Sequence, residues 1–78
     1  MKEKKQSKKS FTVDFIKHEI FKVEIPPRWR IGQFVFNRVE SLYGFVAREV
    51  QFCDNIDCFY NDNNIDTFLE KVCKRLNK

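Results

Sequence analysis

The sequence predicts a small α+β domain in which a short N-terminal β-hairpin or strand pair packs on two main helices, residues 28–43 and 64–77. Apolar and polar residues alternate through residues 10–25, which is typical of strands. In the two later segments apolar residues recur every three or four positions, which is typical of helices. An all-α fold is the alternative, because residues 10–25 also contain a helical spacing, at Val13, Ile16, Ile20 and Val23.

Residues 10–25 form the first predicted element. Aromatic and β-branched residues, which favour strands, alternate here with polar ones: Phe11, Val13 and Phe15, then Phe21, Val23 and Ile25. The link between the two triplets contains Lys17-His18-Glu19 and lacks the Gly or Asn of a tight hairpin turn. We expect two short antiparallel strands here. Pro26 and Pro27 end them, because proline has no backbone N–H for a ladder hydrogen bond.

Residues 28–43 form the first main helix. Its apolar face is interrupted only by Arg38 and contains Ile31, Phe34, Val35, Val39 and Leu42. Gly44 stands where glycine commonly ends a helix. Gly32 costs the helix about 1 kcal/mol relative to alanine, so we expect another backbone to approach the first turn closely. We expect residues 45–51 to form a short second helix and residues 52–64 to form an acidic loop.

Residues 64–77 form the second main helix, with a wide apolar stripe of Ile65, Phe68, Leu69, Val72, Cys73 and Leu76. Asn63 or Asn64 caps its start, and the basic residues near its end suit the helix dipole. The predicted core is rich in phenylalanine: Phe11, Phe15, Phe21, Phe34, Phe45, Phe59 and Phe68. Exposure of a face containing Phe21, Phe36 or Phe52 would indicate a homodimer or a partner contact.

The charge of the chain is concentrated in its first nine residues. The 78 residues have a formal net charge of +4, and residues 1–9 contain five lysines and one glutamate, which account for all of it. We expect residues 1–9 to be a disordered basic tail and residues 10–78 to form a single globular domain with balanced charge. No apolar run reaches the length of a membrane span and no secretory signal is evident. The expected location is the cytoplasm, with no membrane contact.

Residues suited to catalysis are few. His18 is the single histidine and lies among polar residues, and no second histidine stands near Cys58 to form a thiolate pair. The three cysteines, Cys53, Cys58 and Cys73, are expected to be free thiols. With two glycines, the phosphate-binding glycine motifs are excluded. We therefore predict that the protein is not an enzyme and has no metal or cofactor.

Two functions remain. The leading prediction is a non-catalytic interaction or regulatory module with an unknown protein partner, a homodimer being one form of this. The alternative is a nucleic-acid-binding protein, because two guanidinium groups beside an indole can stack on bases and contact phosphates. Its predicted contacts are the lysines of the tail and one cluster of the domain: Lys4, Lys5, Lys8, Lys9, Arg28, Trp29 and Arg30.

Two motifs resemble those of small uncharacterised proteins of bacteria and their phages. They are Arg30-Ile31-Gly32-Gln33-Phe34-Val35-Phe36-Asn37 and Asp57-Cys58-Phe59-Tyr60-Asn61-Asp62, within a likeness that covers residues 28–76. The family usually has proline where this chain has Cys58. The resemblance implies an Arg-x-Gly-Gln-x-x-x-Asn helix before an Asp-x-Phe-Tyr loop, and no established activity.

The motif also has a structural interpretation. Gln33 and Asn37 are four residues apart on one helical face, where their amides can hydrogen-bond the backbone of residues 59–62. We therefore predict a polar clamp between the first main helix and the aromatic loop, formed by Gly32, Gln33, Asn37, Phe59 and Tyr60.

Overall fold

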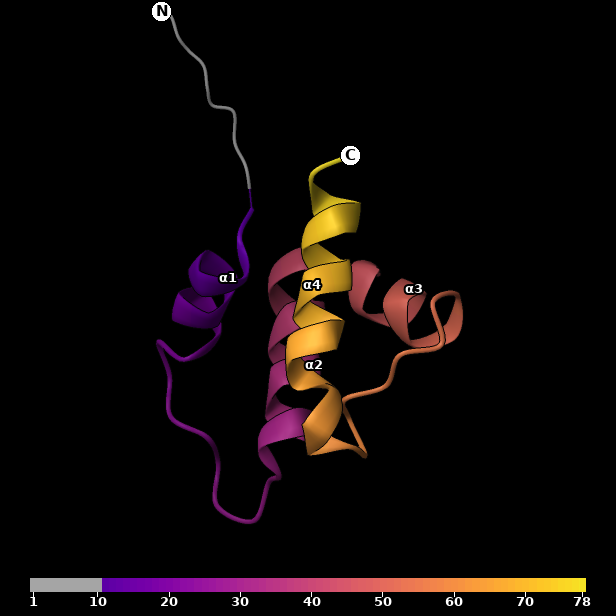
Figure 1. The fold of residues 1–78 in the computed structure, drawn as a ribbon. Coiled ribbons are helices and arrows are strands. Elements are labelled where there is room, and N and C mark those ends of the chain that lie inside the picture. Colours follow the sequence, from indigo (N-terminus) through magenta and orange to yellow (C-terminus); the bar gives the residue numbers. More distant parts are fainter. Residues whose placement is uncertain (1–10) are drawn as a thin grey trace, which may run out of the picture.

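The computed structural model describes residues 11–78 as an all-α fold (Figure 1). Its elements are α1 (Val13–Ile20), α2 (Ile31–Tyr43), α3 (Val46–Phe52), a single 3-10 turn η1 (Asp62–Asn64) and α4 (Ile65–Leu76). Residues 11–78 contain no strand. The predicted α+β class and its N-terminal strand pair are therefore wrong, and the all-α alternative is correct. The predicted basic tail, residues 1–9, lies outside the described residues.

Helix α1 forms where strands were predicted. The Thr12 side chain caps it by accepting a hydrogen bond from the backbone N–H of Phe15, at 3.1 Å. Ile16 and Ile20, four residues apart, are fully buried. The guanidinium of Arg38 on α2 donates to the carbonyl of Ile20 at 3.1 Å and to that of Glu19 at 3.0 Å. Arg38 thus satisfies the C-terminal carbonyls of α1, which explains a basic residue on the apolar face of α2.

Residues 21–30 form an irregular segment between α1 and α2, here called the connector. Pro26 and Pro27 begin a tight turn in which the Trp29 N–H donates to the Pro26 carbonyl at 3.2 Å. Arg28 has a φ of 75°, a left-handed conformation that favours glycine. Helix α2 starts after this turn, at Ile31, three residues later than the sequence predicted.

The other helices agree with the predictions in place and type. Gly44 ends α2 with a φ of 81°, and its N–H donates to the Glu40 carbonyl at 2.9 Å. The predicted short helix at residues 45–51 is α3, shifted by one residue. The predicted stripe of α4 is confirmed, because Phe68, Leu69, Val72 and Cys73 are all buried.

Helices α1 and α3 lie on opposite sides of α2 and α4, and each contacts both (Figure 1). Helices α2 and α4 meet through Phe36 and Phe68, whose ring centroids are 5.7 Å apart. The described chain begins and ends at one end of the molecule, because the Asn77 side chain pairs with the backbone of Phe11. None of the helices in residues 11–78 is long and apolar enough to cross a membrane.

The division of the phenylalanines between core and surface differs from the prediction. Phe34 and Phe68 are buried, and Phe11 and Phe59 are partly buried. Three of the predicted core residues are instead exposed, namely Phe15, Phe21 and Phe45. Of the three residues suggested for an exposed face, Phe21 and Phe52 are exposed, whereas Phe36 is only 5 % exposed and belongs to the core.

Candidate functional site

The first turn of α2 packs directly on residues 57–62, and we call this contact the α2–loop junction. A Cβ added to Gly32 would lie 2.0 Å from the carbonyl oxygen of Cys58. The Gly32 N–H donates to Asp62 Oδ1 at 3.0 Å, and Cys58 Sγ donates to the Gly32 carbonyl at 3.5 Å. The close backbone approach predicted at Gly32 is confirmed, and the approaching backbone is that of Cys58.

The carboxylate of Asp57 organises the loop side of this junction. It accepts hydrogen bonds from the backbone N–H groups of Phe59 (3.2 Å) and Tyr60 (3.0 Å), and from the Gln51 side chain at 2.7 Å. The Asn64 side chain donates to the Asp57 carbonyl at 2.8 Å. The predicted clamp did not include Asp57, Gln51 or Asn64. An aspartate two and three residues before backbone donors is a common turn arrangement, which could have indicated Asp57 from the sequence.

The predicted roles of Gln33 and Asn37 are not found in the described part of the chain. Both side chains are partly exposed on α2, and neither hydrogen-bonds residues 57–62. Polar contacts between α2 and residues 57–62 exist, but other groups make them: Asp62 and Cys58 bond the backbone of Gly32, and Arg30 bonds the carbonyl of Phe59. The polar contacts of Gly32 and Arg30 therefore replace the amide contacts that the spacing of Gln33 and Asn37 suggested.

One residue of the predicted nucleic-acid cluster, Arg30, takes part in the α2–loop junction. Arg30 Nη2 donates to the Phe59 carbonyl at 3.2 Å, and its guanidinium lies 5.8 Å from the centroid of the Tyr60 ring. Arg28 and Trp29 are exposed in the turn of the connector. Arg28, Trp29 and Arg30 are neighbours in the connector, but the Arg30 guanidinium is directed to residues 59 and 60. Lys4, Lys5, Lys8 and Lys9 lie outside the described residues.

The outward side of α3 has the most exposed phenylalanines in residues 11–78. Phe45 is 77 % exposed and Phe52 is 72 % exposed. They are seven residues apart, which places them on the same side of the helix. Between them, Arg48 forms an ion pair with Glu40, and Glu49 lies 3.6 Å from Arg75. We call this surface, formed by Phe45, Arg48, Glu49 and Phe52, the α3 face.

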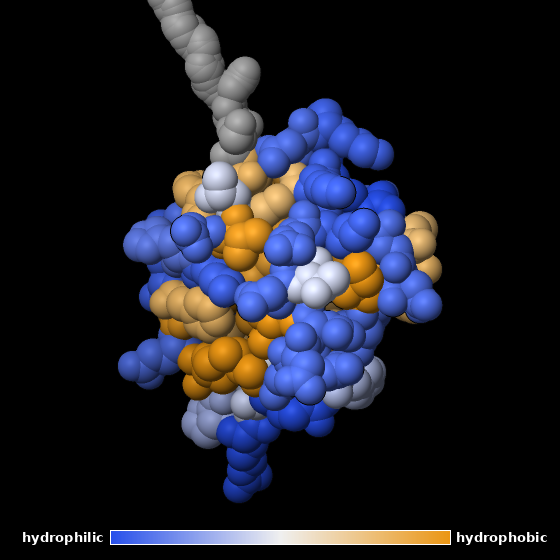
Figure 2. Space-filling view, viewed as in Figure 1, coloured by the Kyte–Doolittle hydropathy of each residue, from blue (hydrophilic) through white to orange (hydrophobic). Residues whose placement is uncertain are grey.

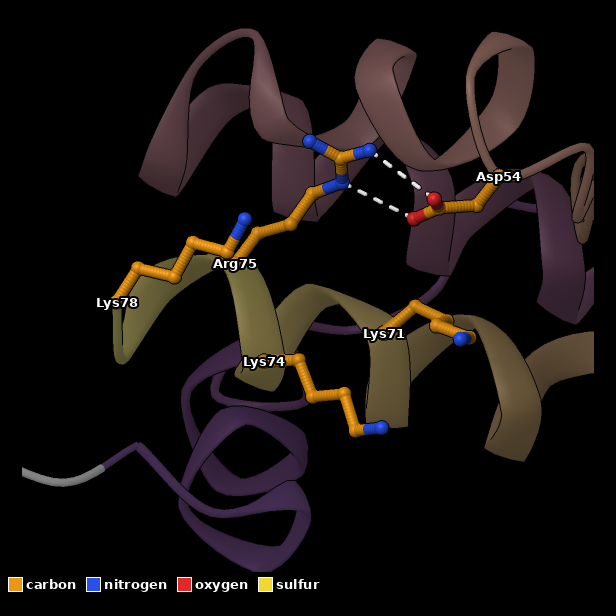
Figure 3. Close-up of a pocket in the computed structure, with 5 residues that line it drawn as sticks. All are labelled: Asp54, Lys71, Lys74, Arg75 and Lys78. Carbon is orange, nitrogen blue, oxygen red and sulfur yellow. Dashed lines mark hydrogen bonds and ion pairs between the residues drawn. The ribbon is translucent and has the colours of Figure 1, made fainter.

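A pocket of about 150 Å³ lies between α4 and the end of α3 (Figure 3). All of its lining residues are charged: Asp54, Lys71, Lys74, Arg75 and Lys78. Arg75 donates two hydrogen bonds of 3.0 Å to the carboxylate of Asp54. These bonds hold the pKa of Asp54 below its ordinary value and raise the pKa of Arg75.

The three lysines of this pocket form what we call the basic end of α4. Lys71 and Lys74 lie three residues apart on α4, and Lys78 follows the last residue of the helix, Leu76, by two residues. No acidic group within residues 11–78 forms an ion pair with any of them. Figure 2 shows hydrophilic surface around this end of α4 and hydrophobic surface beside α1 and the connector. Asp54, which lines the same pocket, partly balances this charge, because Arg75 above all, and then Lys71 and Lys78, lower its pKa.

The groups with nucleophilic or metal-binding chemistry are dispersed. Burial raises the pKa of the Cys58 thiol to about 12, so this group stays protonated at neutral pH. His18 is exposed on α1 and Cys53 is exposed after α3. Within residues 11–78, no group of three or more His, Cys, Asp or Glu side chains is placed to hold a metal ion.

No protein-family model, curated protein or solved structure matches this chain.

Proposed function

We propose that this protein is a non-catalytic interaction module that binds a protein partner through the α3 face. The observation that carries the proposal is the exposure of Phe45 and Phe52, two large apolar side chains on one side of a short helix. Exposed apolar surface of this kind is a feature of contact surfaces, and aromatic residues are enriched in protein interfaces.

The fold does not require these two phenylalanines. Helix α3 is held to the core by its opposite side, where Val46, Ala47 and Val50 are buried. Burial of a phenylalanine side chain contributes about 1.5–3 kcal/mol, and neither Phe45 nor Phe52 gains this in the isolated fold. The same free energy becomes available when a partner covers the α3 face.

The charges of the α3 face suit an apolar contact. Arg48 pairs with Glu40 and Glu49 lies beside Arg75, so each charge between the two phenylalanines has a partner within the fold. These pairs restrain the charged side chains between the aromatic rings and leave the face electrically balanced. A partner with an apolar patch of its own fits such a surface better than a highly charged one.

Two further observations support the non-catalytic part of the proposal and a cytoplasmic location. The Cys58 thiol is buried and stays protonated, which removes it as a nucleophile at neutral pH. Cys53, Cys58 and Cys73 are all free, as is usual for proteins in the reducing cytoplasm.

Site-specific photocrosslinking tests the proposal. In the full chain, p-benzoylphenylalanine replaces Phe52, and the variant is irradiated in the native cell. The expected product is one adduct of defined mass, reduced about fivefold when Phe45→Ser is added, because the two rings contact one partner. An adduct of twice the chain mass would identify the partner as a second copy.

The control is the same photoreactive residue at His18, which is exposed on α1, on the opposite side of α2 and α4 from α3. Circular dichroism of Phe45→Ser confirms that the helices remain. No adduct at position 52, or the same adducts from positions 52 and 18, would contradict a contact surface on α3.

A further inference from the structure

The connector contains a segment that complements itself. We propose that residues 21–25 pair with the same residues of a second copy of this chain, antiparallel and across a two-fold axis at Val23. The pairing joins two molecules, and each copy keeps its all-α fold. The connector lies on the side of α1, away from α3, so this contact is separate from the α3 face (Figure 1).

Three apolar side chains of this segment are exposed in the isolated fold. Phe21 is 41 % exposed, Val23 is 48 % exposed and Ile25 is 37 % exposed. The Phe21 ring also packs on the Phe34 ring of α2, with centroids 5.8 Å apart, so one end of the segment is anchored to the fold. Covering these side chains removes apolar surface from water, which supplies the driving force for a contact.

The backbone of residues 22–25 is unpaired within residues 11–78. None of its four N–H groups donates a hydrogen bond and none of its four carbonyls accepts one. A row of free backbone groups is a template on which another chain can pair. No hydrogen bond of this backbone has to break before residues 22–25 extend along a second chain.

Pro26 and Pro27 limit the length of the row. Proline has no backbone N–H, so the free donors end at Ile25. A two-fold contact uses the same surface of both copies and therefore closes at a pair of molecules. We infer a dimer and no longer assembly.

The charges of residues 21–25 select a second copy as the partner. With Val23 opposite Val23 of the second copy, Lys22 lies opposite Glu24 and Phe21 lies opposite Ile25. The two-fold axis repeats each pair, so the contact contains two pairs of opposite charge and no pair of like charge.

The same charges exclude the neighbouring registers. A shift by one residue sets both Lys22 and Glu24 against apolar residues. A shift by two residues sets Lys22 against Lys22, or Glu24 against Glu24, of the second copy. In the isolated fold Lys22 forms an ion pair with Glu19 at 3.1 Å. Exposed pairs of this kind contribute little, so Lys22 is free to turn to Glu24 of the second copy.

Disulfide trapping in the full chain tests the two-fold axis. The background variant is Cys53→Ser, because Cys53 is exposed whereas Cys58 and Cys73 are buried. Adding Val23→Cys places two thiols opposite each other, and the Cα separation of opposite residues in an antiparallel pair, about 4.5–5.5 Å, suits a disulfide. Oxidation with copper phenanthroline should convert most of the chain to a species of twice its mass on a non-reducing gel.

Ile25→Cys in the same background is the matched control. The two Ile25 positions are four residues out of register, about 14 Å apart along the paired chains, which is too far for a disulfide. Trapping at position 25 should be at least about fivefold weaker than at position 23. Equal trapping at both positions, or none at position 23, would overturn the pairing.

Charge reversal with sedimentation equilibrium tests the register. Lys22→Glu alone and Glu24→Lys alone place like charges opposite each other twice, so each should raise the dissociation constant of the dimer about tenfold. The double variant Lys22→Glu with Glu24→Lys restores opposite charges and should return to within about threefold of the wild type. Circular dichroism checks that the helices remain in each variant. A double variant as weak as the single variants would overturn the register.

The same measurement separates this contact from the α3 face. Phe45→Ser with Phe52→Ser should leave the dissociation constant unchanged, because the two surfaces share no residue. A dimer lost in this variant, or a wild-type chain that is monomeric at every concentration, would overturn the proposal. An intact dimer without a photocrosslinked adduct at position 52 would contradict the α3 proposal alone.

Discussion

Two irregular segments flank the first turn of α2, and they are built in opposite ways. Residues 57–62 pack on this turn with their polar groups paired: Asp57 accepts three hydrogen bonds, and Asp62 accepts one from Gly32. The connector, residues 21–30, instead exposes Phe21, Val23 and Ile25. Its described backbone forms one internal turn bond, from the Trp29 N–H to the Pro26 carbonyl.

The difference shows what holds an irregular segment in place in a small fold. Apolar residues alone do not fix the connector, because Phe21, Val23 and Ile25 all remain exposed and gain little from burial. Short polar side chains fix residues 57–62, because they bond backbone N–H groups that no helix satisfies. We therefore expect stability to depend strongly on the α2–loop junction and weakly on the connector.

Gly32→Ala should give the largest loss of stability. The new Cβ would lie 2.0 Å from the Cys58 carbonyl oxygen and 2.6 Å from Asp62 Oδ1. Since a backbone atom cannot move aside as a flexible side chain does, the free energy of unfolding should fall by about 2–3 kcal/mol despite the higher helix propensity of alanine. Thermal unfolding followed by circular dichroism should show a Tm lower by about 10 °C or more.

Gly44→Ala is the matched control. Nothing lies within 4 Å of a Cβ added at Gly44, but its φ of 81° is unfavourable for alanine. The expected loss is about 1 kcal/mol, from backbone strain alone. If Gly32→Ala were no more harmful than Gly44→Ala, the close approach of the Cys58 backbone would not contribute to stability.

Asp57→Ala should have the next largest effect. It removes the acceptor of the Phe59 and Tyr60 N–H groups and of the Gln51 side chain. Each net hydrogen bond contributes about 0.5–1.5 kcal/mol, so the free energy of unfolding should fall by about 2 kcal/mol. Urea unfolding monitored by circular dichroism measures the change as a lower midpoint.

Asn37→Ala provides the control for Asp57→Ala. Asn37 was predicted from the sequence to belong to the clamp, but within residues 11–78 it makes no hydrogen bond with residues 57–62. We expect a change within about 0.5 kcal/mol. A loss at Asn37 as large as that at Asp57 would restore the sequence-based version of the clamp.

These comparisons show which parts of the fold the sequence could predict. The stripe of α4 was predictable because its apolar residues fit a single helical period, and Gly32 was predictable because glycine inside a helix usually has a packing reason. In residues 10–25 the apolar positions fit both a strand period and a helix period. The helix forms because Thr12 caps its start and Arg38, eighteen residues after Ile20, satisfies its last carbonyls. That contact is tertiary, so no local pattern reveals it.

The candidate sites were predictable to a smaller extent. Phe45 was expected in the core because it begins an apolar pattern, yet its position before α3 turns it to solvent. The late lysines of α4 were interpreted as favourable to the helix dipole, which explains their sign but not the pocket that they line with Asp54. The pairing of Asn77 with Phe11 is likewise a contact between the two ends of the described sequence, which no local pattern reveals.

Arg28→Gly should produce the smallest change, and in the opposite direction. Arg28 has a φ of 75°, a conformation that costs most residues about 1–2 kcal/mol and glycine almost nothing. The greater freedom of glycine in the unfolded chain offsets about 0.5–1 kcal/mol of this gain. The net result should be a Tm higher by about 2–4 °C in thermal unfolding.

Glu24→Gly, at an exposed connector position that lacks a positive φ, should lower the Tm slightly. If Arg28→Gly behaved like Glu24→Gly, the turn at residues 26–29 would not be strained, and the connector would resemble the α2–loop junction more closely than its contacts indicate.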